Sequence, residues 1–253
     1  MIQALFMRPL QAESKFKLSK RLTQLPDQYI ARMAEICVNY FPDQSLMEQT
    51  VRNHLKNADT VRLAFLRDRV VGFSVASKYK MQTPFFSKPV NVIFQRMLYL
   101  EPGVLYRGLG LRLLGATLRD LFGWLWPFKR LVAICRTQNP VVVKIMNMYN
   151  VVYPQYNQPL PSNIRQFSES LLPMLGAESL DERCRLIGTL RSFTGKDYTD
   201  IWNRYLHRRK STYEKLMLNS AFKEEEGRVI NTGAFVLMVA YAKPLRFIRY
   251  LFH

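Results

Sequence analysis

A short run of glycine and arginine has the residue types needed to hold an anionic group. Residues 107–112 read Arg-Gly-Leu-Gly-Leu-Arg, and the leucines that follow have helical spacing. The N–H groups of a first helical turn have no acceptor inside the helix, and the helix dipole favours an anion beside them. Glycine lets the backbone approach such a ligand closely. The run therefore predicts a phosphate cradle, or else Gly108 and Gly110 only begin a helix tightly.

The elements around this run would position it. The apolar run Val92–Leu100 has the length of a strand, so we expect a strand, a glycine-bearing turn and a helix from Arg107 to about Gly123. A further buried strand is predicted at Arg130–Cys135. Asn139 as N-cap and Pro140 as first helical residue then begin a helix that is predicted to run to about Asn150.

Upstream of the cradle the apolar periodicity changes from helical to extended. We expect two helices, from Pro26 to about Phe41 and from Ser45 to Lys56, the second with Ser45 and Glu48 as a capping box. Two strands, Thr60–Leu66 and Val70–Tyr79, follow around a tight turn. Lys80–Pro89 is polar and contains prolines, so it is predicted to be a loop.

The last hundred residues are expected to add helices and one strand. Helical segments are predicted at Asn163–Leu175, Ser179–Phe193 and Tyr198–Phe222, and a strand at Gly233–Lys243. This pattern divides the chain into a core of residues 1–154, a helical insertion or lid of residues 155–230, and a final strand with a basic apolar tail in residues 231–253.

The element order and the Arg107–Arg112 turn together resemble the GNAT superfamily of N-acyltransferases over about residues 26 to 153. The acyl-CoA signature of that family reads Q/R-x-x-G-x-G/A. Arg107 stands at its first position and Gly110 at its fourth, whereas Arg112 stands where the family has Gly or Ala. A cation beside a pyrophosphate is electrostatically favourable. The resemblance implies an α/β (α+β) fold with a mixed, mostly antiparallel central sheet flanked by helices.

This resemblance also implies a reaction and its donor. The chain would be an N-acyltransferase in which an amine attacks acetyl-CoA, or another acyl-CoA, directly. The pantetheine arm would lie in the V between strands Val92–Leu100 and Arg130–Cys135 and contact Asn139. The residues implied to bind the donor are Met97, Leu98, Tyr99, Leu100, Arg107, Gly108, Leu109, Gly110, Leu111, Arg112 and Asn139.

Two residues are candidates for proton transfer. The resemblance implies a tyrosine that protonates the departing CoA thiolate, usually seven or eight residues after the asparagine. Tyr149 is ten residues after Asn139, with Tyr153 as a weaker substitute, and a tyrosine at the edge of the core is the alternative. Glu101 is the candidate general base, against a solvated loop residue, and water is a further possibility for that role.

Charge favours anionic partners without choosing among them. Lys and Arg number 37 against 19 Asp and Glu, a formal net charge of +18. CoA, an acidic acyl carrier protein, nucleic acid and an anionic membrane all qualify. The run His207–Lys210, with aromatic residues around it, could contact nucleic acid, but an ordinary amphipathic helix is favoured. The tail Pro244–His253 could contact a membrane surface.

Cysteine and histidine usage argues against a metal. Cys37, Cys135 and Cys184 are far apart and form no pair with zinc-ligand spacing, which favours a reducing compartment. No signal peptide and no apolar run of transmembrane length is predicted. We therefore expect a soluble cytoplasmic protein, with membrane-surface contact left open.

Two alternatives to an acyl-CoA enzyme are a catalytically silent GNAT-like binding or regulatory module and an acyltransferase whose donor is acyl carrier protein.

Overall fold

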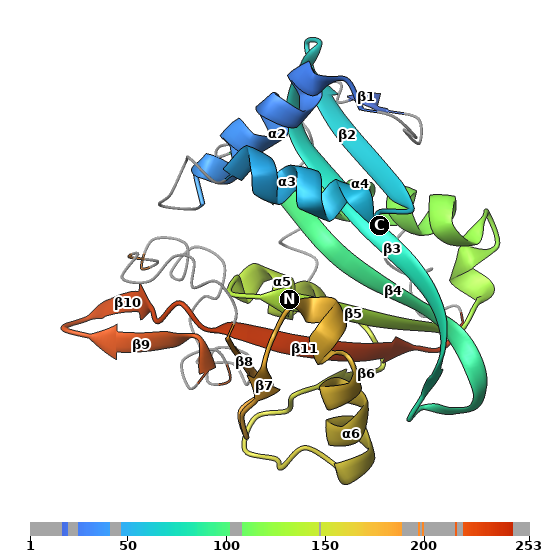
Figure 1. Ribbon diagram of the computed structural model, residues 1–253, viewed down its shortest axis with the longest axis vertical. Helices are drawn as coiled ribbons and strands as arrows, with labels where there is room; N and C mark the ends of the chain where they lie inside the picture. Colours follow the sequence, from blue (N-terminus) through green and yellow to red (C-terminus); the bar gives the residue numbers. More distant parts are fainter. Residues whose placement is uncertain are drawn as a thin grey trace. The chain divides into compact units, whose positions relative to one another are not determined.

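The computed structural model describes residues 17–19, 25–40, 47–101, 108–146, 148–188 and 220–244, together with residues 197, 199 and 216. The described residues divide into two compact units. The first contains residues up to Tyr79 and Ile93–Lys129, and the second contains Lys80–Val92 and the residues from Arg130 onward. Figure 1 labels the helices and strands and colours them along the sequence.

The first unit contains the strands and helices that carry the glycine turn. Its sheet has the order β1-β2-β3-β4, and β2 pairs antiparallel with both β1 and β3. Strand β3 continues past Tyr79, and strand β4 begins before Ile93. Part of each strand therefore belongs to the second unit. The elements are β1 (Lys17–Leu18), α2 (Asp27–Val38), α3 (Met47–Lys56), β2 (Thr60–Leu66), β3 (Arg69–Thr83), β4 (Phe86–Leu100), α4 (Leu109–Phe122) and the 3-10 turn η1 (Trp126–Phe128).

Helices cover both faces of this sheet because consecutive residues of β2 and β3 are buried, and successive side chains of a strand point to opposite faces. On one face the helices α2 and α3 pack onto residues such as Leu63, Phe73 and Met97. On the other face α4 packs through Leu109 and Leu113 onto a smaller cluster that includes Ala64, Val71 and Leu100. The glycine turn thus begins a helix that is fixed to the sheet by buried contacts.

A buried ion pair fixes the later half of α4 to β2. The Arg62 guanidinium binds the Asp120 carboxylate, and both side chains are less than a tenth exposed. Thr60 Oγ1 also donates a hydrogen bond of 3.0 Å to Asp120 Oδ2. A buried charge left without its partner costs about 3–5 kcal/mol, so this pair specifies where α4 lies on the sheet.

The second unit is built around the last strand of the chain. Strand β11 (Phe235–Ala242) pairs antiparallel with β5 (Leu131–Thr137) along its length. It also pairs antiparallel with β6 (Val151–Tyr153) and β8 (Arg185–Ile187). The remaining elements are α5 (Pro140–Met146), α6 (Ser162–Ser170), α7 (Leu172–Leu175), β7 (Ser179–Leu180) and the ribbon of β9 (Phe222–Glu225) and β10 (Arg228–Asn231).

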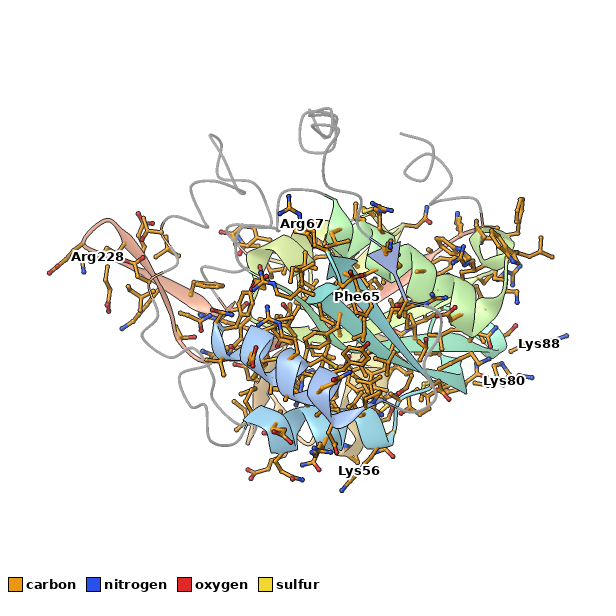
Figure 2. All side chains as sticks on the ribbon, turned by 90° about the horizontal axis from the view of Figure 1, so that it is seen from above. Lys56, Phe65, Arg67, Lys80, Lys88 and Arg228 are labelled. Carbon is orange, nitrogen blue, oxygen red and sulfur yellow. The ribbon has the colours of Figure 1, made fainter. Side chains whose placement is uncertain are left out.

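The predicted loop at Lys80–Pro89 is wrong, because β3 extends to Thr83 and β4 begins at Phe86. Exposed polar side chains alternate along the β3 arm of this hairpin, at Lys78, Lys80 and Gln82. Figure 2 shows Lys80 and Lys88 extending away from the hairpin. Within the second unit, the Phe86 ring packs edge-on against Tyr241 with centroids 4.9 Å apart, and the Phe85 ring stacks on Tyr241 at 5.5 Å. These contacts hold the hairpin extended.

The helix predicted at Ser179–Phe193 is wrong over the residues that the structure describes. Residues 179–188 form a hairpin of β7 and β8 instead. Asp181 Oδ1 accepts hydrogen bonds of 2.8 Å from the N–H groups of both Arg183 and Arg185. This local capping of a turn competes with a helix. The segment predicted as one helix at Asn163–Leu175 is divided into α6 and α7.

The predicted fold class is confirmed. Two helices, three strands, a helix, a strand and a helix follow one another in the expected order, and the pairs β1–β2, β2–β3 and β5–β11 are antiparallel. The division of the chain at residues 154 and 230 stays a prediction. Among the described residues, no helix is both long and apolar enough to cross a membrane.

Candidate functional site

The helix α4 begins at a glycine in a left-handed conformation. Gly108 is the N-cap, with φ of 64° and ψ of 8°, and a side chain there would point into open space. Its carbonyl accepts a hydrogen bond of 3.1 Å from the N–H of Arg112, so the first N–H groups of the helix belong to Leu109, Gly110 and Leu111. Such groups have no acceptor within a helix. The geometry fits an anion held by main-chain donors.

The helix start lies close to the end of β4. A Cβ atom at Gly110 would be 3.7 Å from Leu100 Cδ1, which is ordinary contact. At Gly72 on β3, however, a Cβ atom would come within 2.5 Å of Leu100 Cδ2 and 3.2 Å of the Tyr99 carbonyl oxygen. Gly72 therefore allows β3 and β4 to lie together beneath the turn.

Strand β4 contains an irregularity just before this point. Gln95 Nε2 bonds Ser74 Oγ at 3.1 Å, and Ser74 bonds Thr117 of α4, so Gln95 faces α4. Met97 belongs to the cluster with α2 and α3 on the opposite face. Residues two apart on a regular strand share a face. The strand therefore accommodates one extra residue at Arg96, which is the geometry of a β-bulge.

Gln95 and Arg96, the residues at the bulge, have polar side chains with defined partners. Arg96 donates hydrogen bonds to Ser77 Oγ at 2.6 Å and to Tyr79 Oη at 2.8 Å. Gln95 Nε2 also donates to the carbonyl oxygens of Val75 at 3.1 Å and Met97 at 2.7 Å. Side-chain donors thus satisfy main-chain acceptors where the ladder of strands is disturbed.

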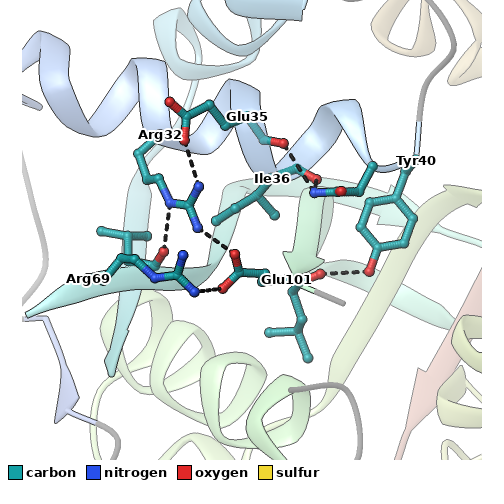
Figure 3. Close-up of polar contacts among 9 residues, drawn as sticks. Arg32, Glu35, Ile36, Tyr40, Arg69 and Glu101 are labelled. Atoms are coloured by element: carbon teal, nitrogen blue, oxygen red, sulfur yellow. Dashed lines mark hydrogen bonds and ion pairs between the residues drawn. The ribbon is translucent and has the colours of Figure 1, made fainter. Parts of the chain in front are cut away.

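The predicted donor-binding residues of β4 differ in exposure. Met97 and Leu100 are buried, whereas Leu98 and Tyr99 are partly exposed. The Leu100 carbonyl accepts a hydrogen bond of 2.6 Å from the Tyr40 hydroxyl, which the close-up in Figure 3 shows. The role of these residues in binding pantetheine stays a prediction.

Glu101 lies between two arginines. Its Oε1 accepts from Arg32 Nη2 at 2.7 Å, and its Oε2 accepts from Arg69 Nη2 at 2.6 Å (Figure 3). Burial opposes the charge on Arg32, but its hydrogen bonds to Glu35 and Glu101 outweigh this and raise its pKa. Both oxygens of Glu101 are engaged in charge-assisted bonds, an arrangement that ties α2, β3 and the end of β4 together. The general-base role of Glu101 stays a prediction that this arrangement does not favour.

Asn139 stands at the start of α5 as expected. Its N–H donates to Thr137 Oγ1 at 2.9 Å, and its carbonyl accepts from the N–H of Val142 at 3.0 Å. The helix begins at Pro140, which has no backbone N–H that would need an acceptor. The N-cap position is confirmed, while contact of Asn139 with pantetheine stays a prediction.

Tyr149 lies in the turn after α5, because this helix ends at Met146 and not near Asn150. The Tyr149 N–H donates to the Met146 carbonyl at 3.0 Å, and the side chain is buried. Burial, together with the nearby Cys135, raises the pKa of the phenol. The raised pKa makes the proton of this phenol harder to release.

Some predicted site residues lie outside the described residues. Arg107 is one of them, as are the basic run His207–Lys210 and all of the tail beyond Pro244. Arg112, at the departure from the family signature, is exposed. Among the described residues, no group of three or more His, Cys, Asp or Glu side chains could hold a metal ion.

Sequence reasoning missed the polar pair at the bulge. Gln95 and Arg96 are adjacent polar residues inside an otherwise apolar strand, and that interruption was the available signal. The pairing of Arg32 and Arg69 with Glu101 had no such signal, since these residues are far apart in the chain.

No family model matches the chain, and no curated protein is similar to it in sequence. Several solved structures are similar in shape. An aminoglycoside N-acetyltransferase AAC(6')-Iy in complex with CoA has 15% identity and a TM-score of 0.39, covering 55% of this chain and 88% of that one. An aminoglycoside 6'-acetyltransferase type Ii has 14% identity and a TM-score of 0.40, covering 56% and 88%. The Escherichia coli GNAT family N-acetyltransferase YhbS in complex with CoA has 12% identity and a TM-score of 0.37, covering 52% and 66%.

These similar proteins are all acetyltransferases, and two of them hold CoA. The recognition of a GNAT-like fold rests on the element order and on the strand, bulge, glycine turn and helix described above.

Proposed function

We propose that the chain is an acyl-CoA-dependent N-acyltransferase that moves an acetyl or longer acyl group from a CoA thioester to an amine. The observation that carries the proposal is the start of α4, where left-handed Gly108 is followed by the first-turn N–H groups of Leu109, Gly110 and Leu111. Main-chain N–H groups and the helix dipole suit the CoA pyrophosphate there. Gly110 adds no side chain that would keep a phosphate away from the backbone.

The proposed reaction is a direct displacement. The amine nitrogen attacks the thioester carbonyl carbon, the carbon–sulfur bond breaks, and CoA leaves as a thiolate that takes up a proton. The amine loses a proton in the same reaction, which water can carry away. Tyr149 is the residue that we propose as proton donor, because the GNAT resemblance implies a tyrosine after Asn139 and a phenol carries a proton at neutral pH.

A charge placed in the cradle tests donor binding. In Gly110→Asp a carboxylate enters the first turn of α4, where the helix dipole favours it but a pyrophosphate would be repelled. Its Cβ atom has room, with the nearest other atom at 3.7 Å. The matched control Gly115→Asp places the same group further along the same helix, where a Cβ atom meets nothing within 4 Å. Thermal unfolding is measured with CoA, acetyl-CoA and longer acyl-CoAs.

We expect these ligands to raise the unfolding temperature of the wild-type protein and of Gly115→Asp. Gly110→Asp should fold normally and lose the shift. If no thioester and no free CoA shifts the wild-type protein, the donor is not a CoA compound. An equal shift in all three proteins would place the CoA away from α4.

A second candidate function is a GNAT-like module that binds acyl-CoA without catalysis. The engagement of both Glu101 oxygens by arginines favours it, because these ion pairs give the carboxylate a structural role that joins α2 and β3 to the end of β4. Release of free thiol from acetyl-CoA with a panel of amines separates the two. Ligand-induced stabilisation without thiol release would support the binding module. If thiol were released from acyl carrier protein thioesters and not from any acyl-CoA, the result would support acyl carrier protein as the donor.

A further inference from the structure

One short turn after α4 displays most of the large apolar side chains that are exposed among the described residues. Trp124 is 79% exposed, Leu125 is 67% exposed and Phe128 is 56% exposed. Elsewhere in the described part of the chain, only Ile187 is a comparable case, at 45%. Apolar surface concentrated in this way marks a site of contact with a partner.

The turn holds these side chains in place. The Gly123 N–H donates to the Arg119 carbonyl at 2.8 Å, and the Trp126 N–H donates to the Gly123 carbonyl at 3.1 Å. The 3-10 turn Trp126–Phe128 follows, in which Trp126 itself is only 6% exposed. Trp126 thus anchors the turn in the first unit, while Trp124 is turned to the solvent. The exposed rings are presented by an ordered backbone.

Cations adjoin the apolar residues of the turn, and the segment of the chain that forms it contains no carboxylate. The Arg119 guanidinium lies 4.7 Å from the centre of the Trp124 ring, and Lys129 Nζ donates to the Phe122 carbonyl at 2.6 Å. The sequence has no Asp or Glu from residue 121 to residue 168. Asp120, the last carboxylate before that stretch, is buried against Arg62. The turn therefore combines apolar side chains with positive charge that no carboxylate of its own segment neutralises.

We propose that the turn of residues 123–129 docks the protein on an anionic lipid surface. Trp124, Leu125 and Phe128 enter the interface between headgroups and acyl chains, and Arg119 and Lys129 lie at the headgroups. Exposed tryptophan and aliphatic residues beside cations are what such an interface binds. The proposal uses residues outside the acyl-CoA site and does not depend on acyl transfer.

Sedimentation with lipid vesicles tests this docking. The probes are vesicles of phosphatidylcholine alone and of phosphatidylcholine with phosphatidylglycerol. We expect the wild-type protein to bind the anionic vesicles more tightly, and less so as salt screens the charges. The triple variant Trp124→Ala/Leu125→Ala/Phe128→Ala should bind these anionic vesicles at least about tenfold more weakly than the wild-type protein does. Ile187→Ala, which removes an exposed apolar side chain elsewhere, should bind as the wild type does.

The fold of the triple variant is checked by its unfolding temperature, which should be unchanged because the three side chains are exposed. Arg119→Gln should weaken binding to anionic vesicles and leave the weak binding to neutral ones unchanged. The proposal would be overturned if the triple variant bound anionic vesicles as tightly as the wild-type protein does. It would also be overturned if the wild-type protein bound neither kind of vesicle. Self-association that the triple substitution abolishes, or binding to an acidic carrier protein in place of vesicles, would show that the turn contacts protein.

Discussion

At the start of α4, Gly108 and Gly110 are needed for different physical reasons. Gly108 has a positive φ of 64°, which side chains other than glycine rarely adopt. Gly110 is helical and has room for a Cβ atom, so the backbone itself does not require glycine there. The absence of a side chain at Gly110 instead lets a ligand approach the backbone. Substitution of Gly108 should therefore cost folding stability, whereas substitution of Gly110 should chiefly affect a bound ligand.

Removal of the Tyr149 hydroxyl tests whether this residue donates a proton. If the phenol protonates the departing thiolate, Tyr149→Phe should lower kcat by about 10²–10⁴-fold. Donor binding should change little, since the ring remains. Initial rates of thiol release are measured together with thermal shifts by acetyl-CoA. An unchanged kcat would assign Tyr149 to the core alone.

The control for this experiment is Tyr153→Phe, at the residue that is the weaker candidate. Tyr153 lies on β6 and pairs with Val239 of β11 through the backbone. If Tyr153→Phe lowers kcat and Tyr149→Phe does not, the proton donor is the residue on the strand.

At the scale of elements, the close approach of β3 and β4 depends on Gly72. A Cβ atom there would meet Leu100 Cδ2 at 2.5 Å, which a side chain can relieve, and the Tyr99 carbonyl at 3.2 Å, which requires the backbone to move. We expect Gly72→Ala to lower the free energy of unfolding by about 1–3 kcal/mol. Urea denaturation measures the change.

The matched control is Gly115→Ala on α4, where a Cβ atom meets nothing within 4 Å. This change should stabilise the protein by about 0.5–1 kcal/mol, because alanine favours a helix over glycine. Gly72→Ala with no loss of stability would contradict the close approach of the two strands. Addition of Leu100→Ala should be less than additive, because it removes the atom that Gly72→Ala would strike.

At the scale of the whole molecule, acidic residues are scarce in the middle of the chain. Between Asp68 and Glu169 the only acidic residues are Glu101 and Asp120, and both form ion pairs with arginine. The lysines and arginines of this long stretch thus have few carboxylates to pair with. An anionic donor and an anionic surface would both be attracted to the protein, more weakly at high salt.

Buried thiols make the stability of the whole molecule fall at alkaline pH. Burial raises the pKa of Cys135 from 9.0 to about 12. The folded protein therefore holds this proton more tightly than the unfolded chain does. The stabilisation is complete below pH 9.0 and is lost as the pH rises towards 12. We expect the unfolding temperature to fall across this window, and less steeply in Cys135→Ala.

Thermal unfolding at a series of pH values measures this effect. The control Ile134→Val, in the same strand, should lose about 0.5–1.5 kcal/mol at every pH without a change in slope. Equal slopes in Cys135→Ala and the wild-type protein would show that the Cys135 thiol does not contribute.

The sequence by itself determined the elements whose physics is local. The helical periodicity of α2 and α4, the Asn139–Pro140 start of α5 and the glycine turn depend on residues a few positions apart, so they could be predicted. The order of these elements was enough to indicate the fold class.

Only the tertiary structure decided features that join distant residues. Phe85 and Phe86 extend the β3–β4 hairpin by packing on Tyr241, and Glu101 binds Arg32 and Arg69. Neither contact leaves a periodic trace in the sequence. The bulge at Arg96 and the exposure of Trp124 beside buried Trp126 depend on which face each residue meets after packing. Periodicity predicts that a face exists, and the neighbouring elements decide what covers it.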